Sequence, residues 1–586
     1  MQAIFLIILT IVRLLFFLSS SPTVPPQSSS QSEIFEMLTL VKITVLTWAD
    51  VLAVYAMWMT MVYLTEVWKL NFTHAAAIVN LYWGIVAVLP VGLQFLVDAF
   101  MGNYWMVLVS SFAYSAGLGF LSMSTPPVLA GATGTCSAYE PECIGQGQKI
   151  LFYTAVALIA MGMSGHLTSL GAFIAEQFMD SQSNLEDSMP CHFFLSFLMV
   201  ILVPIAGVFA IYYIKPWSIR YGISAICTLV ATLIFLTGSC SYHTHRAQGS
   251  PLTTLFRVFA ASASKIFRRC PRDASQLYEK LDDGYQISHT RRLRCLDKAA
   301  IILATQPLEQ QQNNRWRLCR VTEVEETKSI LCMIPICTTF ILMGVVSSIG
   351  NTYFIEQATH MNRKVGRIKV PLPILLWFYD HAKQQFAKIY FQIGGLTRYG
   401  PTIGIAVSMI FAILCCITAA KVETRRLGAV KRHGLIDKPE ETIPMSIFWL
   451  LPQFLLLGGL DGIADNSIGW FFINQVPPSM ARYMVLFAIA LFGVGIVGSV
   501  LSVYLVGEIS GREGKPSWFQ ETLNKSRLDQ YYWTLAALAA ANLVLYVLMS
   551  IWYAYNDSRS EDDEAPDYGE TAEPFDDNVQ CCCCCA

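Results

Sequence analysis

Long apolar runs dominate this chain and predict its elements. Six of them come before residue 239, at about 38–65, 76–99, 104–124, 150–174, 192–214 and 217–238. Six more come after residue 328, at about 329–351, 370–392, 400–420, 443–472, 482–507 and 531–555. Each run is long enough for a helix that crosses a bilayer, and none has the alternating pattern of a strand. Because only closed hydrogen-bonding elements can cross lipid, the pattern predicts an all-α membrane protein of about twelve spanning helices.

One run, residues 370–392, is much less apolar than the others. After the stretch VPLPILLWFY it carries a set of ionisable and amide side chains, Asp380, His381, Lys383, Gln384, Gln385 and Lys388. These groups are costly against lipid. We therefore predict a spanning helix here whose polar face lies inside the bundle.

A long polar segment, residues 239–328, divides the two groups of runs. It is basic, with Arg257, Lys265, Arg268, Arg269, Arg272, Arg291, Arg292, Arg294 and Lys298. An excess of Lys and Arg in a loop between spans places the loop in the cytoplasm, and an even number of spans then places both termini there. Two other basic segments, 363–369 and 425–432, lie outside in a twelve-helix order, against this rule. The predicted units are a six-helix bundle (37–238), a cytoplasmic central loop (239–328) and a second six-helix bundle (329–555).

The two ends of the chain differ from the rest. Residues 1–36 hold an apolar stretch interrupted by Arg13 and then a run rich in Ser, Pro and Gln. They are predicted to be an appended extension and a linker rather than a signal peptide. Residues 556–586 form an acidic tail that closes on Cys581–Cys585, and a disordered end and a palmitoylated end both fit it.

Composition narrows the classes of protein that remain. Of 586 residues, 54% are hydrophobic and 14% are charged, which indicates that most of the chain lies in lipid. The net charge of -2 gives no basic field, so nucleic acid is not an expected partner. The sequence shows no nucleophile–base pair, metal-ligand cluster or phosphate-binding loop, so we predict neither an enzyme nor an ATP-driven pump, and no cofactor. The expected partners are the lipid bilayer and a small-molecule or ion substrate.

Most of the seventeen cysteines stand alone in apolar runs, where a free thiol behaves as a small hydrophobic group. Cys136 and Cys143 differ, because they flank a short polar loop between the third and fourth runs. A disulfide there and two free thiols both remain open. Asn71-Phe72-Thr73, in the first outer loop, forms a glycosylation sequon.

Ordered motifs in and after the polar segment resemble one known family. They are GSPLTTLFRVFAASASK (249–265), HTRRLRCLDKAAI (289–301), CRVTEVEETKSILCMIPI (319–336), FIEQATHMNR (354–363), SIFWLLPQFLLLGG (446–459), FFINQVPPSM (471–480) and NKSRLDQYYW (524–533). These motifs are similar to those of the proton-coupled oligopeptide transporter (POT/PTR) family, plant nitrate/peptide branch, of the major facilitator superfamily. The resemblance covers about residues 37–555. It implies the major-facilitator fold of two six-helix bundles around a central cavity, alternating access and transport usually driven by protons.

At most of the positions where the family has charged residues for proton coupling, this chain has uncharged ones. The Glu-x-x-Glu-Arg of the family's first helix is matched by Thr47, Asp50 and Val51, and the lysine of its fourth helix by Leu167. Trp470 stands where the tenth helix often has Glu. The resemblance therefore implies a weakened proton machinery, in which Asp50 has neither of its usual cations.

The ionisable groups that remain inside the predicted helices are the candidates for a proton or polar pathway, Asp50, His166, Asp461 and Asp465. An acid in the membrane is a functional candidate because it is expensive unless it pairs or lines water. We expect Asp50 to lack a cationic partner, and both a proton-binding role and a structural role are open. For His166 the alternatives are a proton site and a packing histidine. For Asp461 and Asp465, which lie four residues apart, the alternatives are that they line the pathway or that they cap an unwound turn.

Aromatic and amide residues at corresponding positions are the predicted cavity lining, Tyr55, Tyr63, Tyr82, Trp449, Gln453 and Trp470. Asp98 begins a segment that only partly matches the superfamily's motif in the turn between the second and third helices. Asn103 replaces the usual arginine of that turn, which puts its gating salt bridge in doubt.

These observations predict a multi-pass secondary transporter of a small solute of the peptide, nitrate or organic-acid class. The plasma membrane and the vacuolar membrane are both open as its location. The losses at Thr47, Val51, Leu167 and Trp470 predict weak or no coupling to protons. The alternative is a family member that binds as a sensor or assembly protein and does not transport.

Overall fold

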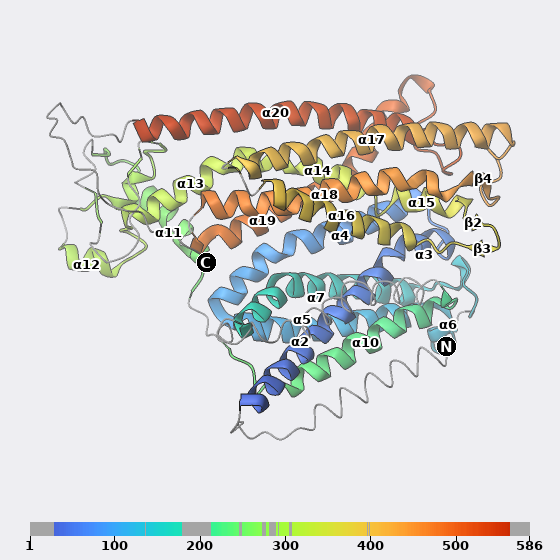
Figure 1. Ribbon diagram of the computed structural model, residues 1–586, viewed down its shortest axis with the longest axis horizontal. Helices are drawn as coiled ribbons and strands as arrows, with labels where there is room; N and C mark the ends of the chain where they lie inside the picture. The colour runs from blue at the N-terminus through green and yellow to red at the C-terminus, as the bar shows by residue number, and fades with distance from the viewer. Residues whose placement is uncertain are drawn as a thin grey trace.

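The computed structural model describes residues 29–134, 136–178, 213–244, 249–271, 277–279, 289–290, 292–303, 307–394, 397, 399–476 and 478–562. Most of these residues are helical, and long helices run side by side along the molecule (Figure 1). Nearly all of the predicted span at 192–214 lies outside the described residues, as do residues 1–28 and Cys581–Cys585.

The N-terminal bundle follows the first group of apolar runs. It comprises α2 (Ser29–Trp58), α3 (Thr60–Glu66), α4 (Phe72–Leu96), α5 (Gly102–Met123), α6 (Pro126–Thr133), α7 (Gln146–Phe178) and α10 (Trp217–Thr237). A π-helical turn, Val97–Met101, joins α4 to α5. Gly102 follows it with a φ of +73°, which glycine adopts without strain, so the helical path breaks there.

The C-terminal bundle follows the second group of runs. It comprises α13 (Val321–Thr338), α14 (Phe340–Ser348), α15 (Tyr353–His360), α16 (Ile374–Gly394), α17 (Gly400–Arg432), α18 (Leu451–Gln475), α19 (Pro478–Ser510) and α20 (Leu528–Asp562). Short strands lie in the connections: β1 (Met361–Asn362) pairs in parallel with β4 (Ile443–Ser446), and β2 (Lys364–Val365) pairs antiparallel with β3 (Ile368–Lys369).

Eight helical stretches of the described chain are long and apolar enough to cross a membrane, and a ninth is obtained if the pair Val321–Thr338 and Phe340–His360, bent by 41°, forms one span. One of the eight, Phe72–Met123, contains both α4 and α5. α16 is not among them, but its backbone lies against Gly458 and Gly462 of α18, inside the bundle. With α4 and α5 counted separately and α16 included, the described helices supply eleven of the twelve predicted spans.

The two bundles meet along α4 and α19, and we call this contact the seam. A Cβ on Gly84 would lie 2.9 Å from the carbonyl oxygen of Gly493, and a Cβ on Gly493 would lie 2.9 Å from that of Gly84. One turn away on α4, Asn80 Nδ2 donates a hydrogen bond to Ser499 Oγ at 2.9 Å, with both side chains buried. Only glycines allow two helix backbones to approach so closely.

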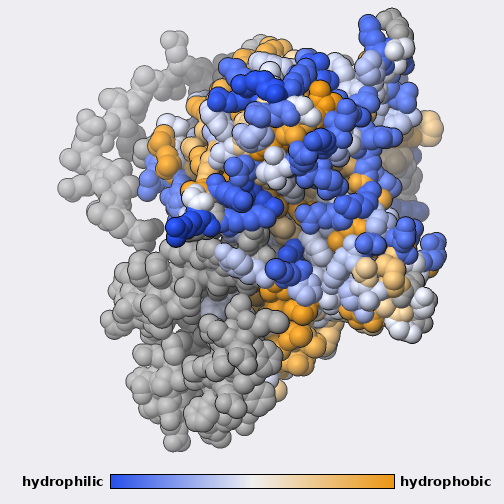
Figure 2. Space-filling view, turned by 90° about the vertical axis from the view of Figure 1, so that its right-hand side faces the viewer, coloured by the Kyte–Doolittle hydropathy of each residue, from blue (hydrophilic) through white to orange (hydrophobic). Residues whose placement is uncertain are grey.

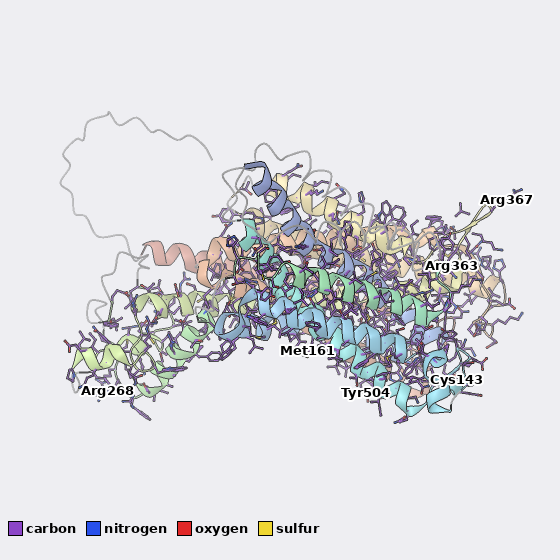
Figure 3. All side chains as sticks on the ribbon, turned by 90° about the horizontal axis from the view of Figure 1, so that it is seen from below. Cys143, Met161, Arg268, Arg363, Arg367 and Tyr504 are labelled. Atoms are coloured by element: carbon purple, nitrogen blue, oxygen red, sulfur yellow. A yellow bond between two sulfur atoms is a disulfide. The ribbon has the colours of Figure 1, made fainter. Side chains whose placement is uncertain are left out.

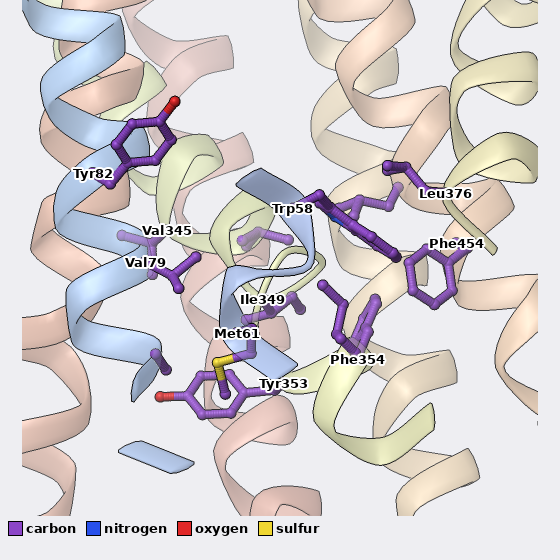
Figure 4. Close-up of a cluster of buried hydrophobic side chains, with 14 of the residues drawn as sticks. Trp58, Met61, Val79, Tyr82, Val345, Ile349, Tyr353, Phe354, Leu376 and Phe454 are labelled. Carbon is purple, nitrogen blue, oxygen red and sulfur yellow. The ribbon is translucent and has the colours of Figure 1, made fainter. Parts of the chain in front are cut away.

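A large cluster of buried apolar side chains also joins the bundles (Figure 4). Its members come from both halves of the chain and include Trp58, Met61, Val79, Val345, Ile349, Tyr353 and Phe354. Trp58 Nε1 donates to Asn351 Oδ1 at 2.9 Å across the same interface. The bundles therefore share one apolar core near the α3 and α15 end of the molecule.

The connections between helices gather at two opposite ends of the molecule (Figures 1 and 3). Arg268 of the central segment lies at one end, and Cys143, Arg363 and Arg367 lie at the other (Figure 3). At the second end Cys136 and Cys143 form a disulfide, which decides between the two alternatives that the sequence left open. Hydrophilic residues cover much of the visible part of this end, as expected for a surface in contact with water (Figure 2).

The described parts of the central segment fold against the C-terminal bundle. It contains α11 (Pro251–Ser264), a 3-10 turn (Asp297–Ala300) and α12 (Leu308–Asn313). Val258, Leu296 and Val324 belong to one buried apolar cluster that joins α11 to α13. α13 begins at Val321, ahead of the apolar run predicted from residue 329.

The basic segment 425–432 forms the last turns of α17, beyond the predicted end of that run near residue 420. Arg426 is fully buried there. Its Nε and Nη2 atoms donate to the two carboxylate oxygens of Glu423 at 2.7 Å each, and Nη1 donates to Asn524 Oδ1 at 2.8 Å. Gln357 Nε2 donates to the same Glu423 at 2.7 Å. One of the charges that stands against the positive-inside rule is thus paired within the protein.

Candidate solute pathway

Asp50 and His166 lie together in the N-terminal bundle. The carboxylate of Asp50 on α2 faces the imidazole of His166 on α7, and His166 Nδ1 lies 2.9 Å from each carboxylate oxygen. His166 Nε2 lies 2.8 Å from Ser111 Oγ on α5. The side chains are 6% exposed for His166 and 21% exposed for Asp50. The expectation that Asp50 lacks a partner was wrong, because an imidazole supplies one.

The hydrogen bonds of Ser111 define how protons are arranged around this pair. Ser111 Oγ donates to the carbonyl oxygen of Val107 at 2.7 Å, so it offers a lone pair to the ring and His166 Nε2 carries a hydrogen. Nδ1 then either donates to an ionised Asp50 or accepts a hydrogen bond from a protonated one. In both forms one proton lies between the two groups.

The residue that faces Asp50 is not the one that the motif alignment selects. Leu167, at the position of the family's lysine, is 54% exposed on the outside of α7. Neighbouring residues of a helix point in directions about 100° apart, so His166 turns inward where Leu167 turns outward. Leu167 thus occupies the lysine position without facing the acid, and the basic group that this helix turns inward is the residue before it, His166.

In the C-terminal bundle, Asp461 lies buried on α18. Tyr379 Oη donates to Asp461 Oδ2 at 2.5 Å, and Ser347 Oγ donates to the same oxygen at 3.1 Å. The other oxygen, Oδ1, has no hydrogen-bond partner among the described residues. Because α18 is continuous from Leu451 to Gln475, Asp461 does not cap an unwound turn.

α16 turns part of its polar face toward α18 and the N-terminal bundle. Lys383 Nζ forms an ion pair with Asp465 Oδ2 at 2.6 Å. Tyr55 Oη, on α2, donates to Asp380 Oδ2 at 3.2 Å and so crosses between the bundles. Asp380 and Lys383 are thus half-buried, whereas His381, Gln384, Gln385 and Lys388 of the same helix are exposed, so the predicted inward polar face holds for only part of the helix.

Negative charge is in excess in this part of the interface. Asp380, Asp461 and Asp465 all act electrostatically on Lys383, which makes its ion pair with Asp465. Among the described residues, the partners of the Asp380 and Asp461 carboxylates are hydroxyl groups. Residues 179–212, which include most of the predicted fifth helix, contain no Lys or Arg. In the part of the chain that the structure describes, these carboxylates therefore outnumber the one cation, Lys383, that acts on them.

Three predicted cavity-lining residues lie in the N-terminal half. Tyr55 reaches the interface and Asp380, as described above. Tyr82 belongs to the shared apolar cluster, and its Oη lies 3.3 Å from Met163 Sδ (Figure 4). Tyr63 packs inside the N-terminal bundle, with its ring centroid 5.1 Å from that of Trp217.

The other three lie in the C-terminal half. Gln453 is buried within that bundle, where its Nε2 donates to Gln357 Oε1 at 3.2 Å. Trp449 is 42% exposed, and the guanidinium of Arg425 lies 3.7 Å above its ring. Trp470 lies beside Phe391 at a centroid distance of 5.8 Å and lines a pocket of about 300 Å³. Of the six, Tyr55 is the residue that hydrogen-bonds to an acid between the bundles, Asp380.

Several residues of the site were not selected from the sequence. Ser111, Ser347 and Tyr379 are hydroxyl residues in apolar runs, and no local pattern marks them as partners of an acid. Asp380 and Lys383 did carry a signal, since they lie three residues apart on one face of the least apolar run. That signal predicted burial of polar groups but did not identify Asp461 and Asp465 as the groups they approach.

Two helix bundles that meet along a seam, with ionisable side chains buried between and within them, are the arrangement of a membrane transporter of the major-facilitator fold. The sequence model described as the POT family matches residues 104–518. The chain belongs to the POT family.

Curated relatives from plants cover nearly the whole chain. It is 43% identical over 522 residues to Protein NRT1/ PTR FAMILY 5.5 of Arabidopsis thaliana, which covers 87% of this chain and 96% of the relative. It is 31% identical over 514 residues to Protein NRT1/ PTR FAMILY 5.6 of the same plant, with 83% and 86% covered.

Solved structures agree on the fold. The crystal structure of an auto inhibited POT family peptide transporter has a TM-score of 0.60 at 15% identity and covers 87% of this chain and 96% of its own. A POT family transporter in complex with 5-aminolevulinic acid has a TM-score of 0.57 at 9% identity, with 88% and 96% covered. At these identities the likeness establishes the architecture.

Proposed function

We propose that this transporter moves a small solute that carries an amine group, by alternating access of one site between the bundles. The observation that carries the proposal is the pair of carboxylates, Asp380 and Asp461, whose partners among the described residues are hydroxyl groups. A buried carboxylate is stabilised by a nearby positive charge. An ammonium group of the solute supplies that charge when it enters.

The contacts between the bundles support alternating access. Tyr55 with Asp380 and Trp58 with Asn351 join the two bundles, so a rocking motion that opens this region has to break them. Lys383 with Asp465 lies within one bundle and moves as a unit. The interface therefore contains bonds that can part while the acidic cluster stays assembled.

The same charges favour one solute class among the three that the sequence left open. A peptide or another amino compound carries an ammonium group, whereas nitrate and a simple organic acid bring only negative charge to a site that already has an excess of carboxylates. Structural neighbours are recorded in complexes with 5-aminolevulinic acid and with a thioalcohol conjugated peptide. 5-Aminolevulinic acid fits this choice, whereas two other neighbours are recorded with sulfate.

Uptake into proteoliposomes tests the proposal with a panel of dipeptides, amino compounds, nitrate and organic acids without an amine. We expect flux of at least one amine-bearing solute and none of nitrate. Nitrate flux without amine flux contradicts the proposed solute class. Binding of an amine-bearing solute without flux, from correctly inserted protein, supports the alternative of a sensor or assembly protein.

Transport is expected to depend weakly on a proton gradient. Asp50, His166 and Ser111 all belong to the N-terminal bundle, so rocking of the bundles leaves their shared proton in place. Coupling requires a charge that changes between the two faces of the membrane. We expect less than about a threefold change in flux between about pH 5.5 and about pH 7.5 with the voltage clamped. A large acid stimulation that Asp50→Asn abolishes contradicts this prediction.

The end that carries the central segment is expected to face the cytoplasm, together with both termini. The disulfide of Cys136 and Cys143 lies at the opposite end, where an oxidising compartment is required, and Asn71 of the sequon lies in the connection between α3 and α4. Tags at either terminus should be inaccessible to antibodies in intact cells if the protein is in the plasma membrane. A fluorescent fusion distinguishes that membrane from the vacuolar one, and an exposed C-terminal tag at the cell surface contradicts the predicted even number of spans.

A further inference from the structure

Groups from three parts of the chain meet at one carboxylate, near the end that holds the central segment. Asp98, in the π turn after α4, accepts hydrogen bonds from Tyr483 Oη at 2.6 Å and from Gln94 Nε2 at 2.8 Å. Its backbone carbonyl accepts the amide hydrogen of Gly249 at 3.0 Å. Tyr483 Oη also lies 2.7 Å from Ser250 Oγ. Because the one phenol hydrogen goes to the carboxylate, the Ser250 hydroxyl donates to Tyr483 and holds the phenol in position.

The central segment is fastened to the C-terminal bundle on its other side. Ser250 is the N-cap of α11, and Lys265, directly after that helix, donates from Nζ to the carbonyl oxygen of Ala299 at 3.1 Å. Asp297, in the same turn as Ala299, forms an ion pair with Lys328 of α13 at 2.5 Å. Lys265, Asp297 and Lys328 are all buried. α11 therefore moves together with α13.

Asn103 stands where the superfamily has an arginine in this turn, and its side chain does not bond to the described residues of the C-terminal bundle. Asn103 Nδ2 donates to Glu176 Oε1 at 2.6 Å, within the N-terminal bundle. The bonds that cross between the bundles here come from α19 instead. Tyr483 bonds to Asp98, as above, and Arg482 donates to the carbonyl oxygen of Thr168 on α7.

We infer that Tyr483, positioned by Ser250, is the latch that closes this end of the transporter in place of the missing arginine. The inference rests on the alternating access of the proposed function. Tyr483 and α11 both move with the C-terminal bundle, whereas Asp98 moves with the N-terminal bundle. Opening at this end consequently breaks the phenol bond and the Gly249 bond, along with the bond from Arg482 to Thr168, so the start of α11 is a working part of the gate.

Hydrogen–deuterium exchange of the full-length protein in lipid nanodiscs, without solute, tests the latch. Tyr483→Phe removes the hydroxyl and keeps the ring, and Ser250→Ala removes the group that positions it. We expect Tyr483→Phe to raise the exchange of backbone amides in 97–104 and 249–256 by about 10- to 100-fold, as the loss of one hydrogen bond to a charged group predicts. Ser250→Ala removes a hydrogen bond between neutral groups and should raise the same exchange by about two- to tenfold. The double variant should exchange no faster than Tyr483→Phe alone, since both substitutions break one chain of bonds.

Tyr504→Phe is the matched control, because Tyr504 is an exposed tyrosine on the same helix. Exchange at 97–104 equal to that of the parent in Tyr483→Phe overturns the inference. If Tyr483→Phe fails to fold, unchanged exchange in Ser250→Ala overturns it equally. Because exchange is measured without a solute, faster exchange confined to the latch supports the inference even if the proposed solute class fails.

Discussion

Replacing Asp461 with asparagine is expected to raise the KM for an amine-bearing solute by about 10- to 100-fold. The amide oxygen still accepts the hydrogen bonds from Tyr379 and Ser347, so the substitution removes mainly the negative charge. A hydrogen bond to a charged group contributes about 1.5–3 kcal/mol, and about 1.4 kcal/mol corresponds to a tenfold change in affinity. Concentration-dependent uptake, normalised to the amount of protein at the surface, measures the change.

Two further variants separate charge from shape at this site. Asp437→Asn is the matched control, because Asp437 is an exposed aspartate paired with Lys525 outside the bundle core, and its loss should leave the KM unchanged. Asp461→Glu keeps the charge on a longer side chain and should fall between the parent and Asp461→Asn. An unchanged KM in Asp461→Asn contradicts the role of this carboxylate in solute binding.

Replacing Arg426 with methionine is expected to destabilise the C-terminal bundle by about 3–5 kcal/mol. The substitution leaves the fully buried Glu423 without its cation and removes the bond to Asn524. Removing one partner of a buried ion pair is costly because the remaining charge stays in a medium that solvates it poorly. Thermal unfolding in detergent, followed by the loss of monodisperse protein, reports the decrease.

The neighbouring arginine provides the control for that experiment. Arg425 stacks on the exposed Trp449 at the surface, so Arg425→Met should have little effect on the melting temperature. Combining Arg426→Met with Glu423→Gln removes both charges and should recover part of the lost stability. Equal melting temperatures for Arg425→Met and Arg426→Met contradict the predicted importance of the buried pair.

The architecture was predictable from the sequence because membrane-spanning helices depend on one local property. A run of apolar residues of the right length is visible without knowledge of any partner, and the runs at 104–124 and 217–238 match α5 and α10 within a few residues. α17 extends well past its apolar run, because the paired Arg426 continues the helix where hydropathy alone predicts a loop.

The site was less predictable because it depends on which face of a helix meets another helix. Asp50 was recognised as an acid in the membrane, but its partner follows from the rotation of α7, which presents His166 and not Leu167. A motif alignment assigns positions in sequence and does not report that rotation. The same reason explains why Tyr379 and Ser347 were missed as partners of Asp461.

The seam of Gly84 and Gly493 has a consequence for how the halves move. Where two backbones touch, no layer of side chains is left to compress or slide, so the distance between α4 and α19 is nearly fixed at that point. Motion of the bundles is then reduced largely to rotation about the contact, with opening at one end and closing at the other. The contact between the two glycines is then the pivot of this rotation, and a methyl group added to either glycine would force α4 and α19 apart.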